Sequence, residues 1–373
     1  MTIFSPRSPA ASPSTPRPFR TATPARHISR TSLFQVAVAR LSWLNAVGVG
    51  LLWLLIFAVS ERFWVGTALT YFPRWPWALP SLALLLAGVL CHRKYAALNL
   101  IAAAMVMGPI SQYQFQFGEP ASIPVNAKPL TVVTCNVQGY RRDFSHVIRE
   151  LIRLDPDIIA FQEALPDNEL VQKHFGKWHA VHRGEFWVGS RYPVHFVDEC
   201  RSQAFDRRTA VCVTVDTPAG EVVLVNVHQM TARRSLNELK GRGIIDGKGP
   251  SRVERHALLR NDEASTTRDF VDHFANFKPT LVMGDLNMPT SSSIYRTHWA
   301  GFINAYDAAG EGYGYTSPCS RFWWWPLETA WLRIDHILTS SHWTASRCNT
   351  GESTGSDHRL VCARLHLAAT PQP

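Results

Sequence analysis

The chain has seven cysteines but no CxxC pair, and its first 129 residues contain only two acidic side chains. The missing pairs exclude the common zinc and dithiol redox motifs. The scarcity of acids locates the charge: residues 1–129 contain 11 basic side chains, whereas residues 130–373 contain 27 basic and 27 acidic ones. The formal net charge of +9 therefore belongs to the first third of the chain. The neutral remainder is atypical of a duplex-DNA-binding domain, which usually carries a basic surface.

The N-terminal residues also lack the composition of a folded core. Residues 1–30 are dominated by Pro, Ser, Thr, Ala and Arg and contain no acid. Such a segment cannot bury enough apolar surface to fold. We therefore interpret residues 1–40 as a disordered basic tail.

Three long runs without any charge follow this tail. They are Leu41–Ser60, Trp75–Cys91 and Tyr95–Phe117, with 20, 17 and 23 residues. A membrane-spanning helix needs about 20 apolar residues, so residues 41–117 are predicted to form a bundle of about three transmembrane helices. Two alternatives stay open: Ala58-Val59-Ser60 also resembles a signal-peptide cleavage site, and the third run also suits a half-buried interfacial helix.

The positions of the basic residues predict an orientation for these spans. The Arg-rich tail and the His92-Arg93-Lys94 connector are expected on the cytoplasmic side. Three spans then place the C-terminal domain on the extracytoplasmic side. The chain is accordingly predicted to be a multi-pass protein of the cell (inner) membrane with a cytoplasmic N-terminus.

After a predicted linker at residues 118–129, the pattern becomes that of an α/β domain over residues 130–368. Phe144–Leu154 and about Val253–Phe277 show helical spacing. Short apolar runs rich in β-branched residues are typical of buried strands; they are Leu130–Cys135, Ile158–Phe161, Val211–Val215, Val222–Val227, Thr280–Met283, Ile334–Leu338 and Leu360–Leu365.

Polar side chains lie beside nearly all of these predicted strands. In α/β sheets a ligand crevice lies outside the strand ends. A single Asp or Asn there is usually a turn former or helix cap, but a repeated pattern indicates one shared site. Its candidate residues are Asn136, Glu163, His228, Asp285, Asn287, Asp335, Asp357 and His358.

The same segments resemble the endonuclease/exonuclease/phosphatase (deoxyribonuclease-I-like) superfamily. The resemblance implies a four-layer sandwich of two mixed β-sheets flanked by helices. It also implies a hydrolase of phosphate esters that depends on Mg²⁺, with Mn²⁺ as the alternative metal, and that has its site at one end of the sheets. The matching segments are TVVTCNVQGY, DPDIIAFQEA, WVGSRYPV, VVLVNVHQM, LVMGDLNMP, RIDHIL and GSDHRLV.

Roles follow from this resemblance and from what phosphodiester hydrolysis requires. Glu163 is expected to bind the metal, because Mg²⁺ prefers carboxylate oxygen, with Asn136 holding a metal-bound water or a phosphate oxygen. Asp357 would bind a second metal or tune His358, so the number of metals stays open. Asp285 would deprotonate the attacking water, and Asn287 would contact the phosphate.

Histidines complete the expected site. His358 would stabilise the transition state or act as general acid or base, with Asp335 fixing its tautomer. His228 matches a phosphate-contacting histidine of the superfamily; the sequence offers no convincing acidic partner for it, although Glu185 is available. His336 falls on the opposite side of its strand and is expected to be a satisfied imidazole rather than a ligand. Cys135 and Cys212 lie in apolar strands and resemble buried free thiols.

The substrate is less well specified. Thr231–Arg260 carries eight basic and three acidic side chains; Arg233 and Arg234 at its start are candidates for substrate binding, although a solvated loop has the same pattern. The Phe322–Trp325 run must expose at least one ring, for a base, a lipid surface or the membrane segment.

Together these features predict a membrane-anchored, Mg²⁺-dependent phosphoesterase that hydrolyses a phosphodiester of a phospholipid or of a nucleic acid. A lipid substrate fits the membrane anchor better. The alternative is a catalytically silent, membrane-bound binding module with the same fold. The full set of acidic, amide and imidazole groups favours the enzyme, because a scaffold has no need of acids gathered in one crevice.

Overall fold

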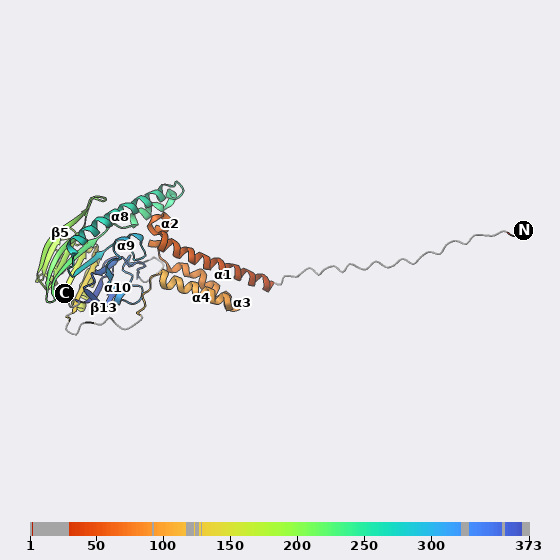
Figure 1. Ribbon diagram of the computed structural model, residues 1–373, viewed down its shortest axis with the longest axis horizontal. Coiled ribbons are helices and arrows are strands. Elements are labelled where there is room, and N and C mark those ends of the chain that lie inside the picture. The colour runs from red at the N-terminus through yellow and green to blue at the C-terminus, as the bar shows by residue number, and fades with distance from the viewer. Residues whose placement is uncertain are drawn as a thin grey trace.

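The computed structural model of the chain describes residues 2, 30–91, 93–116, 123, 127, 129–321, 328–352 and 355–367. Most of the predicted tail (1–40) and of the predicted linker (118–129) lies outside these residues, as does the aromatic run at 322–325. Figure 1 shows a body built of strands and helices from which a group of helices projects at one end.

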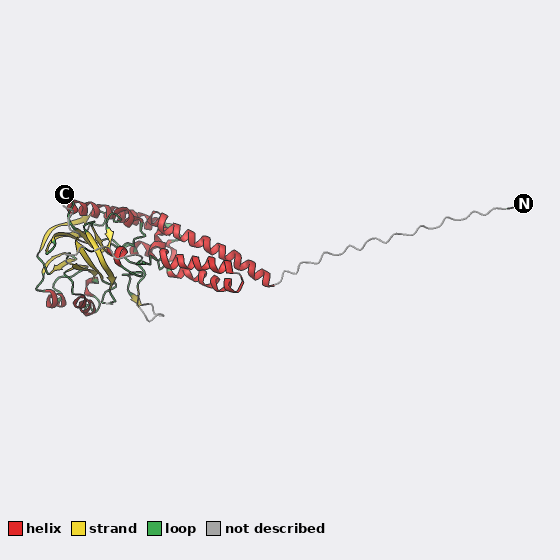
Figure 2. Ribbon diagram, turned by 60° about the horizontal axis from the view of Figure 1, so that its bottom comes forward, coloured by secondary structure: helices red, strands yellow, loops and turns green. Residues whose placement is uncertain are grey.

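Two six-stranded mixed sheets form the centre of the body (Figure 2). The first has the order β13 (Trp343–Thr350), β14 (Val361–Leu367), β1 (Pro129–Asn136), β2 (Ile158–Gln162), β4 (Phe186–Ser190) and β3 (His179–Arg183). The second has the order β5 (Val194–Ser202), β6 (Arg207–Thr217), β7 (Gly220–His228), β8 (Thr280–Asp285), β12 (Asp335–Thr339) and β9 (Ile303–Asn304). A short ribbon of β10 (Ser320–Arg321) and β11 (Glu328–Thr329) lies apart from both sheets.

The two sheets pack face to face around one apolar core. Val132 and Ile158 of the first sheet and Leu224 and Met283 of the second belong to the same buried cluster. One buried polar link also joins the sheets: Gln162 Nε2 donates to Asn226 Oδ1 at 2.7 Å. Because the strands are buried on both faces, they read as nearly continuous apolar runs rather than alternating ones.

Helices cover the outer face of each sheet. α5 (Ser145–Leu154) and α6 (Glu169–Phe175) pack on the first sheet, where Val147 and Leu151 of α5 are buried against Val133 and Ile159. α8 (Lys248–Ala275) and α9 (Ser293–His298) pack on the second sheet. α7 (Arg233–Leu236) and α10 (Ala305–Ala309) are short connecting helices. The expected two mixed sheets flanked by helices are confirmed.

The predicted strands all occur near their expected positions. β3, β4, β5 and β13 are additional to those read from apolar periodicity. β5 and β13 were not predicted because they lie at sheet edges and expose part of their length, as at Phe196 in β5 and Arg347 in β13. Edge strands with mixed exposure lack the continuous apolar pattern of central strands.

The projecting helices are α1 (Arg30–Leu54), α3 (Leu79–Cys91) and α4 (Arg93–Met105). Among the described residues, one helix, Leu33–Arg62, is long and apolar enough to cross a membrane. Trp64–Tyr71, which is α2, and Trp75–Cys91 would form a second span if counted together, but they meet at 93°. The prediction of three transmembrane helices is therefore wrong. The extracytoplasmic, multi-pass placement depended on that number and loses its support.

The third uncharged run shows why counting charges misled. The helix continues from α4 only through Val106–Ile110, and the glutamines beyond it, Gln112, Gln114 and Gln116, contact the α/β body. Gln114 pairs with Gly312 through both backbone hydrogen bonds, at 2.8 and 3.0 Å, and its side chain donates to Asp307 Oδ1 at 3.0 Å. The end of this run therefore belongs to the surface of the body.

The helical bundle has an unusual distribution of polarity. Its buried interior contains a hydrogen-bonded polar cluster in which Asn45 donates to Ser81 Oγ at 2.9 Å and to Asn99 Oδ1 at 3.1 Å. Asn99 in turn donates to Ser42 Oγ at 2.8 Å. Large apolar side chains point outward instead, including Leu44 (67% exposed), Leu86 (70%) and Leu90 (84%). The bundle thus has a polar cluster and an apolar core around Leu52, Ile56 and Val106 inside, and large apolar side chains outside, an arrangement found in helices that pack in lipid.

The segment between α1 and α2 is fixed to the body by a buried carboxylate. Glu61 is 6% exposed and accepts hydrogen bonds from the Ser292 hydroxyl and from the backbone N–H and hydroxyl of Ser293, both at 2.7 Å. It also accepts one from the Tyr71 hydroxyl at 2.9 Å. Since Ser292 and Ser293 lie at the N-terminus of α9, the Glu61 carboxylate also lies where the helix dipole favours a negative charge.

We expect Glu61→Ala to lower the free energy of unfolding by about 3 kcal/mol, because it leaves several buried donors without an acceptor. For a domain of this size that corresponds to a fall in melting temperature of roughly 5–10 °C. The measurement is thermal unfolding of the detergent-solubilised chain. Asp269→Ala, which removes an exposed carboxylate of α8, is the control and should leave the melting temperature nearly unchanged; equal melting temperatures for both variants would contradict the role given to Glu61.

Candidate active site

Three neighbouring strands of the second sheet place the central ionisable groups. In the parallel pair β7–β8, His228 lies opposite Asp285, and in the antiparallel pair β8–β12, Asp285 lies opposite Asp335. Asp335 thus begins its strand rather than ending it. Because β12 runs antiparallel to β8, its start lies at the edge where β8 ends. The register therefore gathers these side chains at one end of the sheets.

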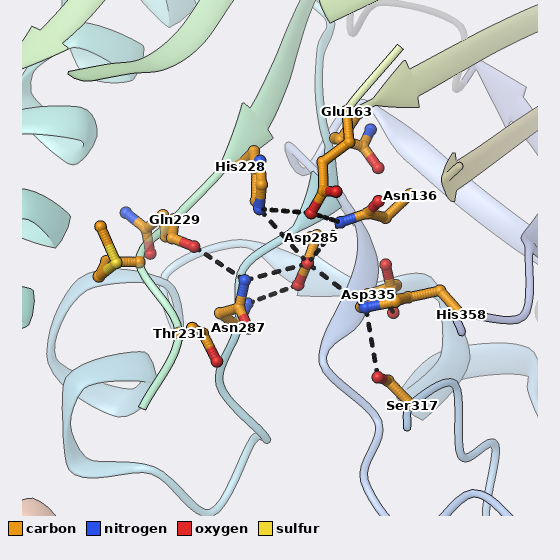
Figure 3. A network of polar contacts seen from close by, with 12 residues as sticks. Asn136, Glu163, His228, Gln229, Thr231, Asp285, Asn287, Ser317, Asp335 and His358 are labelled. Atoms are coloured by element: carbon orange, nitrogen blue, oxygen red, sulfur yellow. Dashed lines mark hydrogen bonds and ion pairs between the residues drawn. The ribbon is translucent and has the colours of Figure 1, made fainter. Parts of the chain in front are cut away.

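The first sheet contributes the amide and carboxylate that face this edge. Asn136 ends β1, and Glu163 directly follows β2, with a positive φ of 53°. Asn136 Nδ2 donates to Glu163 Oε1 at 3.0 Å and to Asp285 Oδ2 at 3.1 Å. Asn136 therefore links the two sheets across the site, as Figure 3 shows.

Asn287 meets Asp285 through a tight turn. Its φ of 52° is left-handed, and its backbone N–H donates to Asp285 Oδ1 at 2.9 Å while Nδ2 donates to Asp285 Oδ2 at 3.0 Å. Asn is one of the few residues that adopt this conformation readily. The adjacent Gly284 is required by close packing, because a Cβ there would lie 2.0 Å from the Val227 carbonyl oxygen.

His358 lies between two buried aspartates. Its Nδ1 is 2.8 Å from Asp335 Oδ2, and its Nε2 is 3.2 Å from Ser317 Oγ and 3.8 Å from Asp285 Oδ2. Burial alone would lower the pKa of His358, but the negative charges of Asp335 and Asp285 raise it to about 10. With both ring nitrogens protonated, Nδ1 donates to Asp335 and Nε2 points towards Ser317 and Asp285.

His228 has an acidic partner and a cation beside it. Its Nδ1 is 3.1 Å from Glu185 Oε1, so the partner that sequence reasoning left open is Glu185. Arg207 NH2 donates to the same Glu185 oxygen at 2.8 Å. Burial lowers the pKa of His228, yet the bond to Glu185 and the charge of Asp285 raise it above its usual value. His228 Nε2 then faces Asp285 Oδ2 at 3.7 Å and Glu163 Oε1 at 3.9 Å.

Asp285 is the most buried of the acids that line the cleft. It is 1% exposed, and burial raises its pKa; the charge of Asp335 raises it further, while that of His358 opposes the shift. A carboxylate with a raised pKa is a stronger base than an ordinary aspartate. Hydrogen bonds donated by Asn136 and Asn287 fix the orientation of the Asp285 carboxylate in the cleft.

The remaining predicted residues lie on the rim of the cleft. Asp357 contacts Arg233, with Oδ2 and NH1 3.9 Å apart, and its Oδ1 is 4.0 Å from His358 Nε2. Arg233 and Arg234 are exposed at the start of α7 and line the same cleft of about 600 Å³. The contacts of Asp357 are thus with the His358 side of the cleft, and its metal-binding role stays a prediction.

Two sets of side chains are candidates for binding a metal, and the second fits better. Asp285, Asp335 and His358 each offer a ligand atom, and these atoms lie within 4.8 Å of one another. However, Nδ1 of His358 is committed to Asp335, and a doubly protonated imidazole is no ligand. Glu163, whose side chain is 40% exposed in the cleft, offers oxygen beside Asn136 and Asp285. Oxygen donors of this kind fit Mg²⁺ or Mn²⁺.

A buried arginine that no motif revealed supports the site from behind. Arg260 of α8 is 2% exposed; it donates to the carbonyl oxygens of Asn287 and Met230, each at 2.8 Å. It also donates to the Tyr71 hydroxyl at 2.9 Å. Since Tyr71 in turn donates to Glu61, a continuous chain of hydrogen bonds connects the segment after α1 to the turn that holds Asn287.

Two negative expectations agree with the structure. His336 is buried, with Nε2 3.0 Å from the Met288 carbonyl oxygen and Nδ1 3.0 Å from Asn304 Nδ2, so it is a satisfied imidazole outside the site. Cys135 and Cys212 are buried and form no disulfide. Burial raises the pKa of the Cys212 thiol to about 12, which keeps it protonated and unreactive.

A sequence model of the endonuclease/exonuclease/phosphatase family matches residues 133–358, which contain every site residue described above. No curated protein matches the chain.

Similar solved structures include an endonuclease/exonuclease/phosphatase from Beutenbergia cavernae, with 17% identity, a TM-score of 0.45 and coverage of 66% of this chain and 73% of that one. Truncated TDP2 from Caenorhabditis elegans has 14% identity, a TM-score of 0.48 and coverage of 64% and 98%. The 3′–5′ exonuclease NExo from Neisseria meningitidis has 20% identity, a TM-score of 0.44 and coverage of 63% and 98%.

The raised pKa of His358 predicts a pH-dependent stability in metal-free protein. A group whose pKa rises on folding stabilises the fold fully below its unfolded pKa, near 6.5, and this contribution is lost as the pH rises through the folded pKa of about 10. We expect the unfolding free energy to fall between pH 6.5 and 10, by at most about 1.4 kcal/mol per pH unit for this group.

The measurement is denaturant unfolding in EDTA, followed by tryptophan fluorescence, for the wild type and for His358→Gln. The variant lacks the titrating imidazole, so its stability should fall less steeply over this range. The same slope in both proteins would show that His358 is not protonated in the fold at neutral pH.

Proposed function

Because the chain belongs to the endonuclease/exonuclease/phosphatase family, we propose that it is a membrane-attached, metal-dependent phosphodiesterase. The observation that carries the proposal is the convergence of Asn136, Glu163, His228, Asp285, Asn287 and His358 on one cleft from five separate stretches of the chain. The buried Asp285, which faces the His358 imidazolium and Nε2 of His228, is arranged for proton transfer and for the binding of anionic oxygen.

The proposed reaction is the addition of water to a phosphodiester, giving a phosphomonoester and an alcohol. A water oxygen forms a bond to phosphorus while the opposite P–O ester bond breaks. Asp285 takes a proton from the attacking water, and the leaving alkoxide takes a proton from solvent; Asp285 then returns its own proton to solvent, so that each turnover consumes one water. Asn136 and Asn287 hold Asp285 in place through the hydrogen bonds described above, and Asn287, which lines the cleft, would contact a phosphate oxygen.

The two imidazoles stabilise the charge that develops during attack. His358 is held as an imidazolium by Asp335, so its Nε2–H is available to the equatorial oxygens of the pentacovalent transition state. His228, fixed by Glu185, presents Nε2 to the opposite side of the same space. Glu163 and Asn136 would hold Mg²⁺ or Mn²⁺, which when bound neutralises phosphate oxygen and helps to orient the substrate.

Membrane attachment rests on the polarity of the helical bundle. α1 is long enough to cross a bilayer, whereas α3, with 13 residues, extends for about 20 Å, short of the roughly 30 Å hydrocarbon core. The outward-facing leucines and the buried Asn45, Ser81 and Asn99 cluster support packing of the bundle in lipid. Since this bundle and the body share contacts through Glu61 and Arg260, the full chain is the unit to test.

The alternative is a membrane-bound module that binds a ligand without reaction. It is disfavoured because Asp285 is buried with a raised pKa beside two imidazoles, an arrangement that costs stability and serves no binding purpose in a neutral scaffold. The nature of the alcohol that leaves, in a lipid or in a nucleic acid, is not decided by the catalytic groups themselves.

We expect the detergent-solubilised chain to hydrolyse bis-p-nitrophenyl phosphate with Mg²⁺ or Mn²⁺ and to stop when EDTA is added. Glu163→Ala should lower kcat/KM by at least about 100-fold through loss of the metal ligand, and Asp285→Asn by about 1,000-fold through loss of the base. The measurement is release of p-nitrophenolate at matched protein concentration.

Asp216→Ala is the matched control, because it removes an exposed carboxylate of β6 that pairs with His195. It should retain the wild-type rate. Equal rates for the wild type and Glu163→Ala would reject the metal site, and a wild type inactive with both metals would favour the binding module.

Membrane attachment has its own test. We expect the chain to remain with membranes after alkaline carbonate washing and to be released by detergent. Replacing Leu44 and Val47, which are 67% and 57% exposed on α1, by Arg should release it, because each charge costs about 2.5–3.5 kcal/mol at the centre of a span. Leu258→Arg, at a position 72% exposed on α8, is the control and should stay in the pellet. Retention of the double variant would show that α1 is not embedded.

A further inference from the structure

A second cavity, of about 180 Å³, opens beside the catalytic cleft. Thr231, Arg233 and Asn287 line both spaces, so the two are continuous at the residue that holds Asp285. Unlike the cleft, the second cavity is mainly apolar; its apolar walls are Tyr71, Phe72, Leu236, Trp331, Leu332 and Ile334.

These walls come from three separate parts of the chain. Tyr71 and Phe72 end α2, Leu236 ends α7, and Trp331–Ile334 precede β12. Tyr71, Leu332 and Ile334 form a buried cluster against which Leu236 and Trp331 pack. The segment after α1 therefore supplies one wall of a cavity that adjoins the catalytic groups.

That wall is held firmly in place. The Trp331 indole N–H donates to the Tyr71 carbonyl oxygen at 3.3 Å, and the Tyr71 hydroxyl is engaged by both Glu61 and Arg260. Because this hydroxyl is already satisfied, Tyr71 offers the cavity its ring and not a hydrogen-bonding group. The cavity is thus preformed for hydrocarbon.

We propose that this cavity binds the first part of an acyl chain of a membrane phospholipid whose phosphate lies in the catalytic cleft. The proposal rests on the proposed phosphodiesterase function and specifies its substrate class. A cavity of roughly 150 Å³ lined by apolar side chains can hold benzene, so the space suits about six carbon atoms rather than a whole chain. Arg233 and Lys240 line its edge and complement the negative charge of a lipid phosphate.

The position of the cavity favours lipid over a nucleobase. Its α2 wall follows directly after α1, the helix whose exposed apolar side chains mark it for the bilayer, and Phe72 is 54% exposed. A base would need hydrogen-bond partners for its edge, but the buried polar groups of the lining are already engaged: the Tyr71 hydroxyl by Glu61 and Arg260, Ser317 by His358, and the Asn287 amide nitrogen by Asp285 and the Gln229 carbonyl oxygen. A lipid phosphodiester satisfies both the apolar cavity and the polar cleft.

The test compares two phosphodiesters with the same head group, dihexanoylphosphatidylcholine below its micelle concentration and its deacylated form, glycerophosphocholine. The chain is held in amphipol to avoid competing detergent. We expect KM for the acylated compound to be at least about tenfold lower, since each buried methylene contributes roughly fourfold. Leu236→Ser, which makes the wall polar, and Leu236→Trp, which fills the cavity, should both abolish this preference.

Ile245→Ser is the matched control, because Ile245 is 84% exposed and lies in the same basic stretch but outside the cavity; it should keep the preference. Titration calorimetry of both compounds in EDTA tests the cavity without catalysis and should show the same loss on Leu236 substitution. Equal binding of the two compounds by the wild type, or a preference that survives in both Leu236 variants, would overturn the proposal.

The outcomes also separate this proposal from the catalytic one. Selective binding of the acylated compound without hydrolysis of any phosphodiester would reject the phosphodiesterase function and retain the lipid cavity. If the dinucleotide thymidylyl-thymidine were cleaved with the higher kcat/KM and depended on Leu236, the cavity would be a nucleobase site and the lipid assignment would be wrong.

Discussion

The burial of one negative charge, that of Asp285, governs the arrangement of this site. A carboxylate removed from water must be compensated by hydrogen bonds and opposite charge, and the surrounding structure supplies both. Asn136 and Asn287 donate to it, and two imidazoles face it within 4 Å. Those imidazoles in turn require Asp335 and Glu185. Each buried charge in this network is therefore compensated by another. Each of these residues stabilises the fold as well as serving the proposed chemistry.

Much of this site was predictable because its residues follow or precede recognisable strands. The runs that end at Asn136, His228 and Asp285 are nearly uninterrupted apolar segments, and their order along the chain matched the family pattern. Two mixed sheets with outer helices were predictable for the same reason. Register was not, since it depends on how strands align across a sheet. Asp335 was grouped with residues that follow strands. It begins an antiparallel strand instead, and it therefore lies at the same edge of the sheet as Asp285.

The residues that sequence reasoning missed lack any local signal. Arg207 lies in a strand and Arg260 in a helix, and neither is distinguishable from a surface cation until the fold buries it. Glu185 lies in the turn between β3 and β4, and its approach to His228 is visible only in the folded chain. The prediction of a transmembrane helix in the third uncharged run was wrong for a different reason, because we took the absence of charge as apolarity. Gln112, Gln114 and Gln116 are neutral but polar, and their side chains contact the α/β body.

The sharing of Arg260 between Tyr71 and the carbonyl oxygen of Asn287 has a mechanical consequence. The helical bundle and the α/β body are therefore not independent units. The segment after α1 contacts, through Tyr71, the same guanidinium that holds the turn at Asn287. Under the proposed membrane attachment, a change in the tilt of α1 would displace the turn that holds Asn287 through this linkage. The boundary of the proposed catalytic unit therefore lies before Glu61, and not at the start of the α/β body.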